Sequence, residues 1–204
     1  MNADLRLRLE KILSEPIKST TAVSGGCIAD SRKLELSSGK LFFLKMARRG
    51  NSGMFDSEAQ GLEELAKTSA VRVPEVVAKD SDFLLLEWIE EGNESTDSSM
   101  EQLGFQFAEL HRFRGKKFGF NADNFLGDSP QSNTPTSAGA ENWATFYAEN
   151  RLQFQAELTE KNGYATPEMR DLLDLLIMKI PELLSGTEEK PSLLHGDLWC
   201  GNYL

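Results

Sequence analysis

The sequence is poor in cysteine and in positive charge, and it has no long hydrophobic run. Two cysteines among 204 residues, Cys27 and Cys200, exclude a disulfide framework. The 22 Lys and Arg against 32 Asp and Glu give a net charge of −10, which excludes non-specific binding to nucleic acid or to an anionic membrane. No apolar run approaches a membrane span, and Arg6 and Arg8 interrupt the N-terminus where a signal peptide has its apolar core. We therefore expect a protein of a reducing, cytoplasmic compartment with no nucleic-acid or membrane partner.

The composition itself is that of a folded globular protein. Hydrophobic residues make up 40% and charged residues 26%, which excludes a wholly disordered, collagen-like or coiled-coil chain. The C-terminal residues 191–204, PSLLHGDLWCGNYL, are rich in chemically functional side chains, whereas chain ends are usually frayed and polar. We therefore expect the sequence to stop inside a larger fold.

Residues 1–90 combine short apolar pieces, bounded by turn residues, with two amphipathic helices. Helical spacing predicts a helix over 3–14 and another over 54–67. The apolar face of the second helix is formed by Phe55, Ala59, Leu62 and Ala66. The apolar pieces predict strands at 17–23, 27–36, 41–45, 75–79 and 83–89. The first three strands form an antiparallel meander, and the continuously apolar last one is typical of a strand covered on both faces.

Residues 91–99, EGNESTDSS, form an acidic polar linker, and the pattern after them is helical. Beyond the linker we expect a helix with Met100, Leu103, Phe107 and Leu110 on one face, a polar loop over 115–140, helices over 141–160 and 167–184, and a strand at 192–194. The organisation predicts an α+β fold of two lobes. These are a β-rich N-terminal lobe (1–90) with one helix between its strands, a hinge (91–99), and a mainly helical, incomplete C-terminal lobe (100–204).

Two glycines, Gly25 and Gly26, lie at the turn between the first two predicted strands. Because glycine has no Cβ, backbone N–H groups there can approach a phosphate closely. The same pair also fits a plain hairpin turn, and from these two residues alone that is the simpler interpretation.

Lys45 ends an apolar strand, where its ammonium group could reach the α- and β-phosphates of a nucleotide. Glu58 follows on the next helix, where its carboxylate could pair with Lys45 and fix its position. Taken alone, Lys45 also fits an exposed lysine at a strand end, and Glu58 a solvated carboxylate near a helix N-terminus.

The ordered octet from His195 to Asn202, HGDLWCGN, is the most specific signal. Asp197 and Asn202 are five positions apart, as are the Asp and Asn in the catalytic loop of protein kinases. At this spacing a carboxylate can orient and deprotonate an attacking hydroxyl, while an amide oxygen coordinates phosphate-bound Mg²⁺. A polar loop after a strand would explain the Asp and the Asn but not the whole octet.

Taken together, these residues resemble the fructosamine kinase (ketosamine-3-kinase) family, which is related to aminoglycoside and choline kinases within the protein-kinase-like fold. The resemblance spans nearly the whole chain. It rests on SGGCIAD, FFLKM, MFDSEAQGL, RVPEV, FLLLEWI, FGFNADNFLG, SPQSN, WATFYAENRL and PSLLHGDLWCGN. The FGF…DN…G and HGDLWxGN pieces are the most specific of these, because aminoglycoside kinases share only HGD and the Asn with them.

The resemblance implies a role for each matching position. It makes Lys45 the phosphate-binding lysine, Glu58 its ion-pair partner, Asp197 the catalytic aspartate and Asn202 a metal ligand. It places Gly25 and Gly26 in the phosphate loop. In the hinge strand it implies that the backbone of Leu86, Glu87, Trp88 and Ile89 holds adenine. On the side facing the sugar it places Asp123, Asn124 and Trp199. Gly196 stands where protein kinases have an arginine, and a second metal-binding aspartate would lie beyond Asn202.

The expected function is therefore ATP- and Mg²⁺-dependent phosphorylation of a ketoamine sugar, including fructosamine or ribulosamine groups on protein lysines. We expect residues 1–204 alone to be inactive, because the second metal ligand is missing. The alternatives are an aminoglycoside- or choline-kinase-like phosphotransferase and a non-catalytic nucleotide-binding protein. Cys27, beside Gly26, predicts redox-sensitive self-association, since backbone dipoles there favour a thiolate, although an inert hairpin residue fits equally well.

Overall fold

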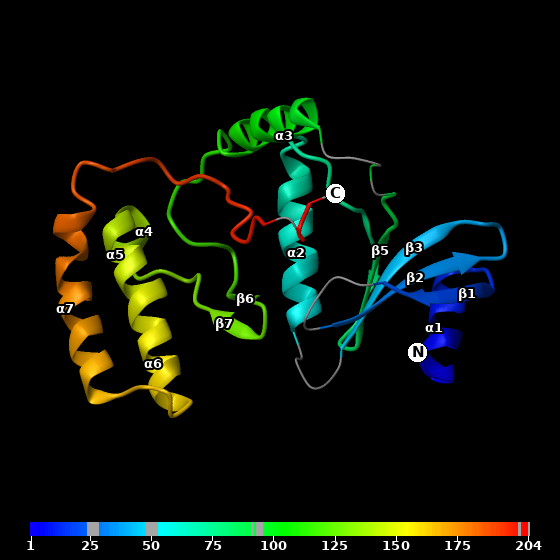
Figure 1. Cartoon of the computed structure of the whole chain (residues 1–204), viewed down its shortest axis with the longest axis horizontal. Helices are drawn as coiled ribbons and strands as arrows, with labels where there is room; N and C mark the ends of the chain where they lie inside the picture. Colours follow the sequence, from blue (N-terminus) through cyan, green and yellow to red (C-terminus); the bar gives the residue numbers. More distant parts are fainter. Residues whose placement is uncertain (24–28, 48–52, 91, 93–95, 200, 204) are drawn as a thin grey trace. The chain divides into compact units, whose positions relative to one another are not determined.

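Figure 1 shows the computed structural model, which describes residues 1–23, 29–47, 53–90, 92, 96–199 and 201–203. The chain forms two compact units. The first contains Met1–Leu110 together with Leu194–Leu204, and the second contains His111–Leu193. The lobe and hinge boundaries expected from the sequence stay predictions, and the helix that follows the hinge begins at Asp97.

The first unit is built on a five-stranded antiparallel sheet with the strand order β1-β2-β3-β5-β4. Its elements are α1 (Ala3–Leu13), β1 (Ile17–Ala22), β2 (Ala29–Leu36), β3 (Leu41–Ala47), α2 (Met54–Lys67), β4 (Val76–Lys79), β5 (Phe83–Glu87) and α3 (Asp97–Leu110). The predicted antiparallel N-terminal strands and the helix over 54–67 are confirmed. Asn2 caps α1 by accepting a hydrogen bond from the Leu5 N–H, which satisfies one of the free donors of the first turn.

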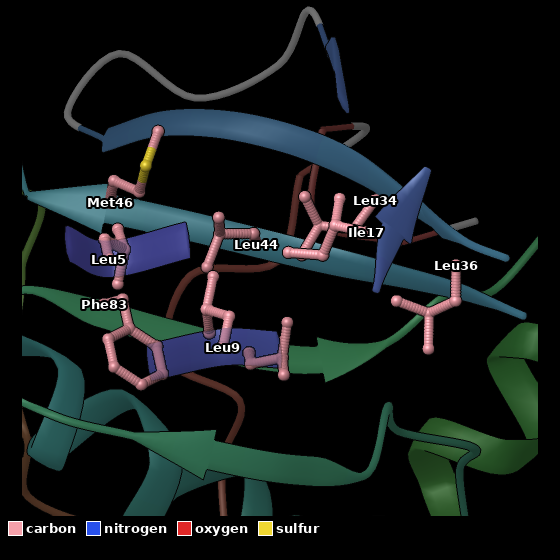
Figure 2. Close-up of a cluster of buried hydrophobic side chains, with 9 residues drawn as sticks. Leu5, Leu9, Ile17, Leu34, Leu36, Leu44, Met46 and Phe83 are labelled. Atoms are coloured by element: carbon pink, nitrogen blue, oxygen red, sulfur yellow. The ribbon is translucent and has the colours of Figure 1, made fainter. Parts of the chain in front are cut away.

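Side chains of the sheet alternate between two separate cores, one on each face. On one face, Leu5 and Leu9 of α1 pack against alternate residues of the strands, as Figure 2 shows. On the other face, Phe55 and Ala59 of α2 pack against Ala29 and the intervening residues of β5. Within β5, Phe83 and Leu85 belong to the α1 core, whereas Leu84 and Leu86 belong to the α2 core. This confirms that the continuously apolar strand is covered on both faces.

The predicted face of the second helix is wrong at its last turn. Leu65 is buried there, whereas Ala66 is exposed. Ala66 instead borders an open groove of about 400 Å³, together with Val71 and Val73 of the connection to β4. Leu65 and Ala66 are adjacent positions of the same turn, so helical periodicity alone misplaces the buried residue by one position.

The second unit contains a small hairpin and a group of helices. Its elements are β6 (Asn124–Leu126), β7 (Ser129–Gln131), α4 (Ser137–Glu141), α5 (Trp143–Tyr147), the π-helix η1 (Ala148–Gln153), α6 (Phe154–Lys161) and α7 (Pro167–Leu183). The predicted helix over 141–160 is thus α5, η1 and α6 in succession. The hairpin and α4 lie within the stretch expected to be a loop.

The strand expected at 192–194 does not form. Ser192 makes one isolated antiparallel bridge to Arg114, and Leu194 is 55% exposed. An apolar run needs a neighbouring strand to complete a hydrogen-bonded ladder, and beyond Arg114 none is present among the described residues. In the part of the chain that the structure describes, no helix is long and apolar enough to cross a membrane.

Candidate active site

Lys45 and Glu58 form an ion pair on the α2 side of the sheet. Lys45 lies between Phe43 and Ala47, which both pack against the α2 core, so the strand alternation turns the lysine toward α2. Its Nζ lies 2.5 Å from Glu58 Oε1, and the two side chains are 29% and 30% exposed. The approach of the two head groups that the sequence predicts is therefore present. Their role toward a nucleotide stays a prediction.

Ser31 is a residue of this centre that the sequence analysis missed. It is the cross-strand partner of Lys45 and is only 6% exposed. Its Oγ is buried without a hydrogen-bond partner among the described residues. Strand alternation places Ser31 on the same face as Ala29, which packs against α2, and the pairing of β2 with β3 would have been the signal to find it.

The predicted hinge strand is held to its neighbour by Glu87. The Glu87 carboxylate accepts hydrogen bonds from Arg72 Nη2 at 2.6 Å and from the backbone N–H of Glu75 at 3.3 Å. The Arg72 guanidinium, followed by that N–H, holds the pKa of Glu87 below its ordinary value. The Glu87 side chain thus supports the sheet, and the adenine contact expected from the backbone of Leu86, Glu87, Trp88 and Ile89 stays a prediction. Gly25, Gly26 and Cys27 lie outside the described residues, so the phosphate loop and the redox role stay predictions.

Asp197 and Asn202 face each other across a tight loop. Asn202 Nδ2 donates to the Asp197 backbone carbonyl at 2.8 Å and to Asp197 Oδ2 at 3.1 Å. The Asn202 N–H closes the turn on the Trp199 carbonyl at 2.9 Å. Gly196 adopts φ +87°, a left-handed conformation that favours glycine, and this explains why no arginine stands at that position.

The same loop leaves the reactive groups accessible. The Asp197 carboxylate is exposed to solvent, and the His195 ring lies 6.4 Å from the Phe107 ring of α3, which anchors the start of the loop. Because Asn202 turns its amide nitrogen toward Asp197, its amide oxygen is the atom left for a cation, and Mg²⁺ prefers oxygen ligands of this kind. The described residues contain no cluster of three or more His, Cys, Asp or Glu side chains suited to a metal. Asn202 therefore fits one ligand position.

Asp123 and Asn124, predicted on the side facing the sugar, have structural partners in the second unit. Asp123 Oδ1 accepts the N–H groups of Asn133 at 2.6 Å and Thr134 at 3.1 Å. Asn124 Oδ1 accepts Asn133 Nδ2 at 2.7 Å. Trp199 belongs to the first unit and is 56% exposed. Sugar contacts of these three residues stay predictions.

Arg151 holds together the same polar network, and the sequence analysis gave it no role. Its Nη1 donates to the Ser132 carbonyl at 2.5 Å, its Nη2 donates to Asn133 Oδ1 at 2.8 Å, and its guanidinium lies 4.9 Å above the Phe146 ring. Burial lowers the pKa of Arg151, and the charge of Asp123 opposes that effect. Arg151 lies in the π-helix η1, a rare helical form that is frequent at functional sites. The motif SPQSN contains Ser132 and Asn133, and WATFYAENRL contains Phe146 and Arg151, but no spacing rule connects the two motifs.

A family model and the curated relatives all indicate the same protein family for this chain. A model of the fructosamine kinase family matches residues 2–204. A probable ketoamine kinase of Synechocystis sp. is 35% identical over 191 residues, which cover 91% of this chain and 61% of that protein. A chloroplastic protein-ribulosamine 3-kinase of Oryza sativa subsp. japonica is 36% identical over 195 residues, which cover 91% of this chain and 54% of that protein. The chain therefore spans less than two thirds of the length of these relatives.

Solved structures agree on the fold. The crystal structure of a candidate fructosamine-3-kinase from Thermobifida fusca matches 99% of this chain and 69% of its own, with a TM-score of 0.83 and 27% identity. The gentamicin complex of the aminoglycoside enzyme APH(2″)-IIa matches 88% of this chain and 57% of its own, with a TM-score of 0.53 and 14% identity, and this supports the kinase-like fold alone. With its family model matched from residue 2 to residue 204, this chain belongs to the fructosamine kinase family.

Proposed function

We propose that this chain carries the nucleotide-binding lobe and catalytic loop of an ATP-dependent kinase for ketoamines. Its substrate would be a fructosamine- or ribulosamine-type sugar on an amine, including a lysine of a glycated protein. The observation that carries the proposal is the hydrogen-bonded pair of Asp197 and Asn202, with the Asp197 carboxylate open to solvent. The names of the ketoamine and ribulosamine kinases above supply the substrate class.

The residues divide the work of phosphoryl transfer. The Lys45 ammonium, held by Glu58, would bind the α- and β-phosphates of ATP. Asp197 would accept the proton of the attacking sugar hydroxyl, and Asn202 would keep that carboxylate oriented through the hydrogen bond to Oδ2. A bound Mg²⁺ supplies neutralisation of phosphate charge, and the Asn202 amide oxygen would hold it. Positioning and charge stabilisation thus supply most of the rate enhancement.

We further propose that residues 1–204 alone bind Mg-ATP without turnover. Asn202 supplies one metal ligand, and no position of this sequence matches the second aspartate that the reaction class uses. The low cysteine content favours a reducing compartment such as the cytoplasm as the location.

The test is Mg-ATP-dependent phosphorylation by the complete gene product, with fructosyl-lysine, ribulosyl-lysine, an aminoglycoside and choline as acceptors. Asp197→Asn should lower kcat by orders of magnitude and leave ATP affinity nearly unchanged, because the carboxylate acts on the hydroxyl. Lys45→Met should weaken ATP binding, and Lys40→Met, at an exposed turn, is the matched control.

Three results would contradict the proposal. Near-normal turnover by Asp197→Asn would show that the loop is not catalytic. Preferential phosphorylation of the aminoglycoside or of choline would replace the substrate class. ATP binding without transfer to any acceptor would favour a nucleotide-binding protein.

A further inference from the structure

The segment directly after α3 is basic, although the protein as a whole carries a net charge of −10. Residues 112–117, RFRGKK, contain four cationic side chains and no carboxylate, and all of these residues are exposed. Many cations elsewhere in the described residues have an acidic partner, as Lys18 has in Glu35 and Lys79 has in Asp56. The segment therefore forms a positive region on a protein of opposite overall charge.

A second segment adds a lysine to this region. The isolated bridge of Arg114 continues into a hydrogen bond from the Gly115 N–H to the Pro191 carbonyl at 2.9 Å. Arg114 Nη1 also donates to the Lys190 carbonyl at 2.9 Å. In the antiparallel register of this bridge, Lys116 is the position opposite Lys190. The two segments, both in the second unit, are thus held together in a way that gathers their positive charges.

The lysine patch, defined as Lys116, Lys117 and Lys190, has no ion-pair partner in the part of the chain that the structure describes. Glu188 accepts a backbone N–H of its own turn at 3.1 Å, and neither Glu188 nor Glu189 pairs with these lysines. Like charges at opposite positions of paired segments repel each other. An anionic group bound between them relieves this repulsion, so the lysine patch fits an external anion.

Building on the proposed function, we propose that the lysine patch binds an acidic segment of the glycated protein whose sugar is phosphorylated. Lys190 lies seven positions before Asp197 in the chain, so covalent geometry keeps the two within roughly 24 Å of each other. About seven extended peptide residues span that distance. The acidic residues of such a substrate would therefore lie within about seven positions of the glycated lysine.

An acidic polypeptide fits the lysine patch better than a nucleic acid does. The patch is small, and the negative charge of the whole protein repels a long polyanion. Phe113, in the same segment, is 44% exposed and offers an apolar contact that a polypeptide side chain can use. The lysine patch therefore selects among glycated proteins by the charge around the modified lysine.

The experiment is a fluorescence anisotropy titration of the 204-residue chain with labelled peptides that share a central fructosyl-lysine. The residues around it are Glu in one peptide, Gln in a second and Lys in a third, and each peptide is titrated at low and at high salt. The Glu peptide should bind most tightly, and its advantage should disappear at high salt because salt screens exposed charges. Lys116→Met combined with Lys117→Met should weaken binding of the Glu peptide about fivefold, the effect of two exposed ion pairs, and leave binding of the Gln peptide unchanged.

Further variants separate recognition from a general effect of charge. Lys116→Glu combined with Lys117→Glu should shift the preference from the Glu peptide to the Lys peptide. Lys161→Met combined with Lys179→Met removes the same charge from exposed positions of the same unit, and this control should behave as wild type. In the complete gene product, Lys116→Met combined with Lys117→Met should raise KM for the Glu peptide and leave KM for free fructosyl-lysine unchanged.

The outcomes separate this proposal from the proposed function. Equal binding of the three peptides by the wild-type chain would overturn the proposal and leave the kinase function standing. Equal losses in the lysine-patch variant and in the Lys161 and Lys179 control would also overturn it, because they would show an effect of total charge. Tighter binding of an oligonucleotide of matched charge than of the Glu peptide would replace the polypeptide with a nucleic acid. Absence of fructosyl-lysine phosphorylation by the complete gene product would contradict the proposed function, and the assignment of the lysine patch to its substrate would fall with it.

Discussion

Lys45 reaches Glu58 because its position in β3 directs its side chain to the α2 face of the sheet, and the pairing of β3 with β2 and β5 fixes that position. Lys45 pairs with Ser31 on one side and with Leu84 on the other. A shift of one residue would turn its side chain to the α1 face, into a core of Leu44 and Met46. Burying an unpaired ammonium there is strongly unfavourable. The strand register that places apolar side chains in both cores therefore also orients Lys45 toward α2.

Ser31→Ala should stabilise the protein. The Ser31 hydroxyl is buried without a partner among the described residues, so removing it eliminates a desolvation cost and leaves only a small change in volume. We expect the free energy of unfolding to rise by about 1 kcal/mol, measured by urea denaturation with circular dichroism.

Ser19→Ala is the matched control for Ser31→Ala. Ser19 Oγ donates to Glu35 at 3.0 Å on the exposed side of β1, so its removal should leave stability unchanged or slightly lower. A loss of stability in Ser31→Ala larger than that in Ser19→Ala would show that the buried hydroxyl has a partner in solution.

At the scale of elements, local patterns predicted the first unit better than the second. The helix over 54–67 and the apolar run of β5 follow from periodicity, because each element meets the face of a large sheet. The expected strand at 192–194 failed because an apolar run does not reveal whether a partner strand exists. Of the candidate site, the Lys45–Glu58 approach was predictable from strand parity and helix position.

The hydrogen bonds of Arg151 in the second unit could not be predicted from local sequence patterns. Arg151 bonds Ser132 and Asn133, which lie nineteen and eighteen positions earlier. No spacing rule connects the residues after β7 to a π-helix over that distance, and a π-helix has no sequence signature of its own. Such partners emerge only when the chain is folded.

Arg151 is one of the residues that tie the segment directly after β7 to η1. The Arg151 guanidinium donates to the Ser132 carbonyl and to Asn133 Oδ1 at the same time. Arg151→Met should therefore lower the free energy of unfolding by about 2–3 kcal/mol. Arg151→Lys should rescue little, because a single ammonium cannot replace the planar fork. Urea denaturation measures both variants, and Lys179→Met, on the exposed face of α7, is the control. Full stability of Arg151→Lys would show that charge alone is sufficient.

At the scale of the whole molecule, acidic side chains outnumber basic ones, yet several of them hold elements together. Glu10 links α1 to β1 by accepting the Ile17 N–H, and Glu35 links β2 to β1 through Lys18. Glu87 links β5 to the segment before β4 through Arg72. The net charge of −10 opposes compaction, so these links place negative charge where a donor compensates it.

These carboxylates predict a loss of stability in acid. The Ile17 N–H lowers the pKa of Glu10, the Lys18 ammonium lowers that of Glu35, and the Arg72 guanidinium lowers that of Glu87. A carboxylate whose pKa is lower in the folded state stabilises it above the unfolded pKa, and that stabilisation disappears as the pH falls through the folded pKa. The ordinary value is 4.5, so urea denaturation should give constant stability from about pH 7 to pH 5.5 and a decline below about pH 4.5.

The decline should depend on the named carboxylates and not on total charge. As the pH approaches the pI near 4.8, the repulsion from excess negative charge falls, which by itself would stabilise the folded state. Glu10→Gln and Glu87→Gln should each lower stability at pH 7 and flatten the acid dependence, because they remove a group that releases its proton on folding. Glu63→Gln, on the exposed face of α2, should leave the curve unchanged. An unaltered slope in both Glu10→Gln and Glu87→Gln would show that these carboxylates do not link stability to pH.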